Sequence, residues 1–172
     1  HVMLPADRFE TRLMVEKLVD YDMPVYMRIG RNPIEDCYEQ EPESFVIGKA
    51  VCMHDGDDIT IVACGETVRV ALDAARLLKQ RGIGCRVLNM HTIKPLDEQS
   101  IIKAADETGK IITIEEHSIY GGLGAAVAET IVQHRPVPVR ILGIPDEPAV
   151  TGNTKEVFRH YGLDAVSVSR LA

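Results

Sequence analysis

The sequence predicts an α/β protein of three layers, α/β/α, in which helices cover both faces of a mostly parallel five-stranded sheet with one antiparallel edge strand. Short apolar runs alternate along the chain with longer amphipathic segments, as strands alternate with helices in such folds. The apolar runs at 59–62 and 111–114 are rich in β-branched residues. Strands of that composition are typical of a parallel sheet that is buried on both faces.

The first 32 residues predict one helix followed by one strand. Asp7 precedes an apolar stripe, and Glu10 stands three residues later, which is the spacing of a capping box. We therefore expect a helix over residues 5–20. A proline-containing break then leads into a short apolar run, which predicts a strand over residues 25–29.

Residues 33–44 contain two prolines and five acidic residues, which is the composition of an interdomain linker. The linker divides the chain into a segment over 1–32 and a domain over 45–172. Because His1–Pro5 opens inside an apolar run without an initiator methionine, we expect that further sequence precedes the segment in the native protein.

Two strand-like runs open the domain, at residues 45–53 and 58–64. His54–Asp57 lies between them and has the polar, glycine-containing composition of a tight turn. We therefore expect an antiparallel hairpin that supplies the edge strand of the sheet. The acidic turn lacks the later ligand positions of an EF-hand, so we expect no metal site there.

The rest of the domain alternates between helices and strands that carry signals at their ends. Gly82 follows the first helical segment in the position of a C-terminal cap, and Asp97 precedes the second in the position of an N-cap. Helices are expected over 66–81, 97–107, 122–134 and 154–160, a helical turn over 164–171, and strands over 85–89, 110–114 and 137–142.

Composition excludes several classes of protein. The chain of 172 residues is 45% hydrophobic and 26% charged, as is usual for a soluble globular protein. Its net charge of −7 argues against nucleic acid as a partner. No apolar run reaches the roughly 20 residues of a membrane span, and no basic region followed by an apolar core marks a signal peptide. The four cysteines form no C-x-x-C pair, so we expect reduced structural thiols, no metal site and a cytoplasmic location.

A glycine-rich turn and a histidine form the first candidate site. Gly121, Gly122 and Gly124 follow a predicted strand and open a helix, where backbone N–H groups can bind an anion. The same glycines also permit a tight turn and close packing of helix on sheet. His117 stands at the end of that strand, where ligands bind in open α/β sheets. Acid–base chemistry and a role at an interface both remain open for it.

Two arginines form the second candidate site. Arg28 and Arg31 flank the end of the first predicted strand. A guanidinium can hold a phosphate through two parallel hydrogen bonds, although an ordinary surface ion pair would also account for each arginine. The residues alone show no catalytic nucleophile, acid–base pair or metal cluster.

Five segments, taken in order, resemble the C-terminal part of the thiamine-diphosphate-dependent transketolases. Each segment is only moderately specific, but together they cover essentially the whole chain with the family's spacing. Residues 1–32 resemble the end of the pyrimidine-binding domain, and residues 45–172 resemble the transketolase C-terminal domain. The segments are Pro5–Thr11, Pro24–Arg31, Phe45–Ala50, Asn89–Asp97 and Glu115–Gly124.

The resemblance implies an enzyme that moves a two-carbon ketol unit between sugar phosphates. In this family thiamine diphosphate and Mg²⁺ supply the chemistry, and both are bound by residues upstream of this chain. The chain alone is therefore expected to bind neither, to contain no catalytic residue and to be inactive. Arg31 matches the arginine that holds the substrate phosphate, and Arg28 is a weaker candidate. The remaining surface is expected to contact an N-terminal region or subunit and a second copy in a homodimer.

The sequence leaves two alternatives open. Related enzymes with the same architecture include 1-deoxyxylulose-5-phosphate synthase and the beta chains of 2-oxo acid dehydrogenases. The chain could also be a non-catalytic regulatory module that binds an anion at Gly121–Gly124.

Overall fold

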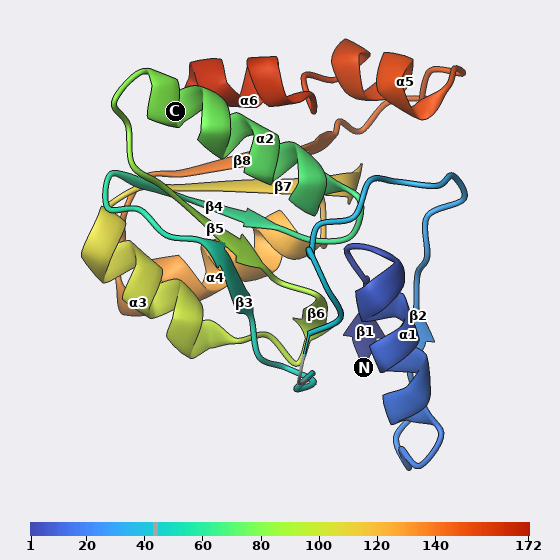
Figure 1. The fold of residues 1–172 in the computed structure, drawn as a ribbon. Coiled ribbons are helices and arrows are strands. Elements are labelled where there is room, and N and C mark those ends of the chain that lie inside the picture. The colour runs from blue at the N-terminus through green and yellow to red at the C-terminus, as the bar shows by residue number, and fades with distance from the viewer. Residues whose placement is uncertain (43–44) are drawn as a thin grey trace.

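A five-stranded sheet forms the centre of the molecule, as the computed structural model of residues 1–42 and 45–172 shows (Figure 1). Its strand order is β3-β5-β4-β7-β8. β4 is parallel to β5 and β7, β8 is parallel to β7, and β3 runs antiparallel to β5 at one edge. The predicted sheet is thus confirmed. The strands are β3 (Val51–His54), β4 (Ile59–Ala63), β5 (Cys85–Asn89), β7 (Ile111–Ser118) and β8 (Val139–Ile144).

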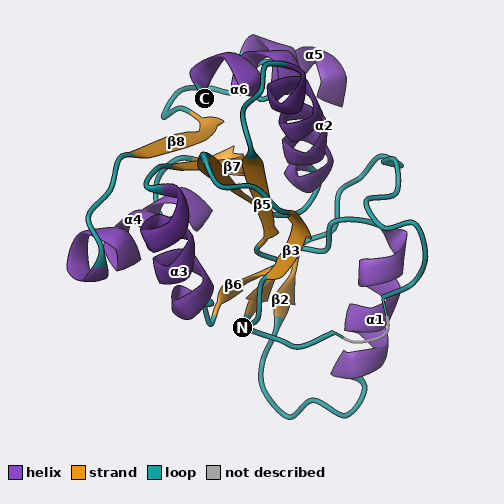
Figure 2. Ribbon diagram, turned by 60° about the vertical axis from the view of Figure 1, so that its left-hand side comes forward, coloured by secondary structure: helices purple, strands orange, loops and turns teal. Residues whose placement is uncertain are grey.

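Helices cover both faces of this sheet (Figures 1 and 2). Side chains of a strand alternate between faces, and all five residues of β4 are buried. Ile61 therefore packs in the core on the face covered by α2, and Val62 packs in the core on the face covered by α3 and α4. One face carries α2 (Thr67–Gln80), α5 (Thr154–His160) and α6 (Ala165–Leu171), and the other carries α3 (Glu98–Thr108) and α4 (Leu123–His134).

Local signals set the ends of two helices as the sequence predicts. Asp97 is the N-cap of α3, and its carboxylate accepts hydrogen bonds from the backbone N–H and the hydroxyl of Ser100. α2 ends just before Gly82, which has a φ of 74°. A left-handed residue at this position is usually glycine because it has no Cβ to clash.

The N-terminal segment is joined to the domain by a second, three-stranded sheet of order β2-β1-β6. β1 is parallel to β2 and antiparallel to β6, which belongs to the domain. The sequence predicts neither β1 nor β6, because strands of two and three residues have no periodicity to detect. The elements concerned are β1 (Val2–Met3), α1 (Arg8–Leu18), β2 (Tyr26–Met27) and β6 (Thr92–Lys94).

The predicted hairpin is wrong in its pairing. β3 pairs with β5, because β4 already has parallel neighbours on both sides and offers no free edge. The turn after β3 crosses the start of β5 instead, where the N–H of Asp58 donates to the carbonyl of Gly84 at 2.9 Å. The strand also begins only at Val51, because the preceding Ala50 donates its N–H to Asp97 at 3.0 Å.

The predicted linker is irregular in structure over residues 33–42, and residues 43–44 lie outside the described residues. It packs against the N-terminal segment. Backbone N–H groups of Cys37 and Tyr38 donate to the carboxylate of Asp7 at 2.8 and 3.0 Å. Arg8 forms a bidentate ion pair with Asp36.

No helix within the described part of the chain is both long and apolar enough to cross a membrane. All four cysteines are free thiols. Burial raises the pKa of the Cys37 and Cys85 thiols to about 12, which keeps both protonated at neutral pH.

Candidate functional site

The candidate residues gather at the carboxyl ends of β4 and β7. The chain passes from β4 through α2 to β5, which lies on one side of β4. It then passes through α3 to β7, which lies on the other side of β4, so the strand order reverses between β4 and β7. Ligands in open α/β sheets bind at such a reversal point. Here the N-terminal segment lies over it, and two neighbouring hollows open on either side of Arg28.

The first, which we call the Arg31 hollow, has a volume of about 330 Å³ and mostly polar walls. Arg31 is exposed, and its side chain makes no hydrogen bond or ion pair with any other described residue. A guanidinium left free at the mouth of a polar hollow can receive a phosphate or carboxylate. The walls comprise Leu4, Pro5, Arg28, Ile29, Gly30, Arg31, Asn32, Gly65, Glu66, Glu116 and Thr154.

Arg28 has a different position from Arg31. Its Nη1 donates to the backbone carbonyl of Glu116 at 2.6 Å, at the end of β7. The bond joins the N-terminal segment to the sheet, across 88 residues of sequence. Arg28 lines both hollows, but its Nη1 is already engaged by the carbonyl of Glu116.

Glu66 is the wall residue that sequence reasoning missed as a site residue. It directly precedes α2, and the residue as a whole is only 9% exposed. A β-carbon on Gly30 would collide with its carboxylate, so the glycine leaves the space that this carboxylate fills. Burial and the nearby Glu116 raise the pKa of Glu66, and Arg28 partly offsets that rise. Its position in the sequence, just after a predicted parallel strand, could have identified it, because ligands bind at the carboxyl ends of such strands.

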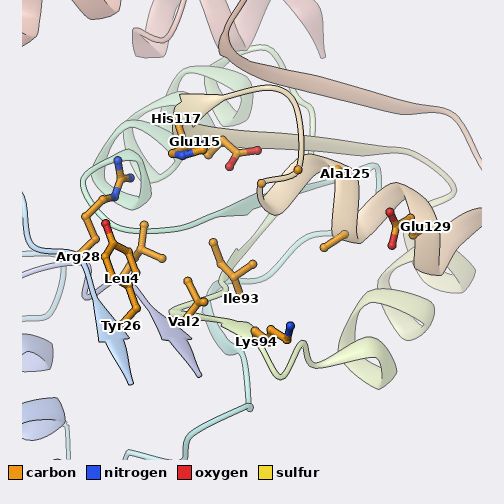
Figure 3. A pocket seen from close by; sticks show the side chains of 13 residues that line it. Val2, Leu4, Tyr26, Arg28, Ile93, Lys94, Glu115, His117, Ala125 and Glu129 are labelled. Carbon is orange, nitrogen blue, oxygen red and sulfur yellow. The ribbon is translucent and has the colours of Figure 1, made fainter. Parts of the chain in front are cut away.

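The second, which we call the His117 hollow, has a volume of about 310 Å³ and lies between β1, β2, β6 and the start of α4 (Figure 3). Val2, Tyr26 and Ile93 give it an apolar floor. His117 stands exposed at its rim, and its Nδ1 lies 3.1 Å from the carbonyl of Ser118.

The glycine turn is engaged by a carboxylate of the chain itself. Glu115 is buried, and its two oxygens accept hydrogen bonds from the N–H groups of Leu123 and Gly124, both at 2.8 Å. A β-carbon on Gly122 would collide with this carboxylate. The N-terminus of α4 therefore already holds an anionic group. These contacts favour the interpretation of the glycines as a packing turn, and two of the N–H donors available for an external anion are taken.

The described residues contain no group of three or more histidine, cysteine, aspartate or glutamate side chains that could hold a metal ion.

Comparisons with known proteins give a consistent result. Residues 48–168 match the family described as Transketolase, C-terminal domain. The chain is 53% identical over 172 residues to an apulose-4-phosphate transketolase subunit of Phocaeicola vulgatus, a match that covers 100% of this chain and 55% of that protein. It is 38% identical to 1-deoxy-D-xylulose-5-phosphate synthase of Heliobacterium modesticaldum, over 99% of this chain and 27% of that protein.

A solved structure described as split gene transketolase, inactive beta4 tetramer, shares the fold. Its TM-score is 0.91 at 37% sequence identity, over 98% of this chain and 55% of that one. The chain thus spans about half the length of the transketolase subunits that it matches.

Proposed function

The chain belongs to the transketolase family, with residues 48–168 matching its C-terminal domain, and from this we propose that it is the C-terminal part of an enzyme that transfers a two-carbon ketol unit between sugar phosphates. Within that enzyme, Arg31 binds the phosphate of the substrate. The observation that carries this role is the free guanidinium of Arg31 at the mouth of a polar hollow, with no partner among the described residues.

The division of labour follows from the residues present. Thiamine diphosphate supplies the carbanion chemistry in the complete enzyme, and the described residues contain no cluster of three or more histidine, cysteine, aspartate or glutamate side chains that could hold its metal. We assign the cofactor and Mg²⁺ to an N-terminal region or subunit. The relative in Phocaeicola vulgatus is one subunit of its transketolase, and the solved neighbour is an inactive assembly, which supports the need for such a partner. The exposed His117 and the domain surface are available for contacts with that partner or with a second copy.

The role of Arg31 predicts a defect that is specific for phosphorylated substrates. In the complex assembled with its N-terminal partner, Arg31→Ala removes a charge-assisted pair of hydrogen bonds and should raise KM for ribose 5-phosphate about tenfold or more. Arg31→Lys keeps the charge but not the planar fork, so its KM should fall in between. Steady-state kinetics with ribose 5-phosphate and with unphosphorylated ribose measure both effects.

Arg140→Ala provides the matched control. Arg140 is an exposed arginine on β8 with no hydrogen bond or ion pair to other described residues, so its loss should leave KM unchanged. An Arg31→Ala complex with wild-type KM for ribose 5-phosphate would contradict the phosphate role. An equal loss with ribose and ribose 5-phosphate would also contradict it, because that result indicates a general structural defect.

The match to 1-deoxy-D-xylulose-5-phosphate synthase supports a second candidate, a sister enzyme with a 2-oxo acid donor. Product formation from pyruvate instead of a ketose phosphate by the assembled complex would favour it over ketol transfer.

A further inference from the structure

The carboxylate of Glu66 lines the Arg31 hollow without a partner. The residue as a whole is 9% exposed, and its carboxylate makes no hydrogen bond or ion pair with the residues that the structure describes. Its oxygens are not among the fully buried polar atoms, so they remain accessible from the hollow. A carboxylate that lines a hollow without a partner from the protein keeps its acceptor positions available to a ligand.

The surroundings of Glu66 restrict what that ligand can be. Four charged side chains line the Arg31 hollow: Arg28, Arg31, Glu66 and Glu116. A cation would be repelled at the arginine side of the hollow, and an anionic group would be repelled at the carboxylate side. A molecule with an anionic end and neutral hydroxyl groups avoids both penalties, since hydroxyls donate to carboxylates without adding charge.

The backbone near Glu66 leaves room for its carboxylate at the wall of the hollow. Gly30 carries no side chain at the place that the Glu66 carboxylate occupies. The hollow volume of about 330 Å³ lies at the lower end of the range of roughly 300–1,000 Å³ for small-molecule sites. Asn32 and Thr154 close one side through a hydrogen bond of 2.8 Å.

We propose that Glu66 is a specificity-determining residue that accepts a hydrogen bond from a hydroxyl of the phosphorylated polyol whose phosphate Arg31 binds. The inference rests on the proposed function and extends it, because it gives the C-terminal domain a direct contact with substrate. In this proposal the residue before α2 binds the sugar hydroxyl, and the N-terminal segment binds the phosphate.

The test separates sugar recognition from phosphate recognition without turnover. Calorimetry on the assembled complex measures the affinities for inorganic phosphate and for sorbitol 6-phosphate, an unreactive polyol phosphate. Glu66→Ala should weaken sorbitol 6-phosphate about tenfold, because a hydrogen bond to a charged acceptor is lost. The same variant should bind inorganic phosphate as well as wild type or slightly better, because a nearby negative charge is gone.

Glu66→Gln keeps an acceptor oxygen and a similar shape, so its affinity for sorbitol 6-phosphate should fall roughly threefold. It also provides a second measurement if the alanine variant does not fold. Glu98→Gln, an exposed glutamate on α3, is the matched control and should change neither affinity. Equal weakening of both ligands in the Glu66 variants, or no change in their ratio, overturns the proposal.

The outcome is distinguishable from failure of the proposed function. If the complex shows no ketol transfer, or Arg31→Ala leaves KM unchanged, the proposed function fails. A Glu66-dependent ratio of the two affinities would still stand on its own as evidence of a polyol-phosphate site.

Discussion

Glu10 shows how one side chain joins three parts of the chain. It lies on α1, is 1% exposed, and its carboxylate accepts hydrogen bonds from the backbone of Ala6, from Asn89 at the end of β5 and from the hydroxyl of Tyr38 in the predicted linker. Burial raises its pKa to about 7, although these donors partly offset the rise. The sequence correctly predicts the Asp7 cap nearby, but the Glu10 carboxylate accepts the N–H of Ala6 and not that of the cap residue itself.

This raised pKa predicts a stability that depends on pH. The folded state binds the Glu10 proton more tightly than the unfolded chain, so the associated stability is fully present below about pH 4.5 and is lost as the pH rises through about 7. The loss should be on the order of 3 kcal/mol. Glu10→Gln is neutral throughout and should not show it. Urea unfolding of both proteins between pH 4.5 and 8 measures the difference.

Wild type must be compared with Glu10→Gln because His91 changes the pH dependence of stability in the opposite direction. Burial lowers its pKa to about 4, so its contribution to stability is lost as the pH falls. The difference between wild type and Glu10→Gln cancels this term. Glu16→Gln, an exposed change on the same helix, should keep the wild-type profile. A constant difference between wild type and Glu10→Gln across the range would refute the assignment.

At the scale of elements, the start of α4 depends on the fit between Glu115 and Gly122. The carboxylate of Glu115 caps the helix through Leu123 and Gly124, and Gly122 leaves room for it. The sequence indicates a tight turn here, because glycines between a strand and a helix predict one. It could not show which anion occupies the N–H groups, since Glu115 reaches them only after β7 and α4 have packed together.

Gly122→Ala should therefore destabilise the protein by about 3 kcal/mol, because the β-carbon displaces a buried carboxylate from its donors. Gly109→Ala is the control: Gly109 has a φ of 65° but open space around its Cα, so only the left-handed strain of about 1 kcal/mol is expected. Chemical denaturation of both variants compares the two costs. A loss at Gly122 no larger than that at Gly109 would contradict the collision with Glu115, because Gly122 has an extended backbone with a φ of −99° and no left-handed strain.

At the scale of the whole molecule, the N-terminal segment is built into the domain. Leu4 packs in the core on the α3 and α4 side, and Ala6 packs in the core on the α2 side. The N–H of Leu4 donates to the carbonyl of His91 at 2.8 Å. Asp7, 3% exposed, caps α1 and also binds two N–H groups of the predicted linker. The division into segment, linker and domain remains a prediction of the sequence, but contacts cross it at many points.

We expect the segment and the domain to unfold as one cooperative unit. In hydrogen exchange, the amide of Leu4 should open with the same free energy as the amides of β5. Asp7→Ala removes a helix cap and two linker contacts, and should lower stability by about 3 kcal/mol. It should also let the Leu4 amide open before β5 does. Independent, low-energy opening of Leu4 in the unaltered chain would contradict this coupling.

The sequence by itself determined the elements whose signals are local: the buried strands of the sheet, most of its helices, the caps at Asp97 and Gly82, and the ordered segments that resemble transketolase. Hydrophobic periodicity and capping depend on residues within a few positions of one another. Only the tertiary structure decided that β3 pairs with β5, that β1 and β6 join the two parts of the chain, and that Glu115 occupies the turn at Gly122. It also placed Glu66 beside Arg31. These arrangements depend on which strand edges remain free and which buried charges find donors, and both are settled by contacts between residues far apart in the sequence.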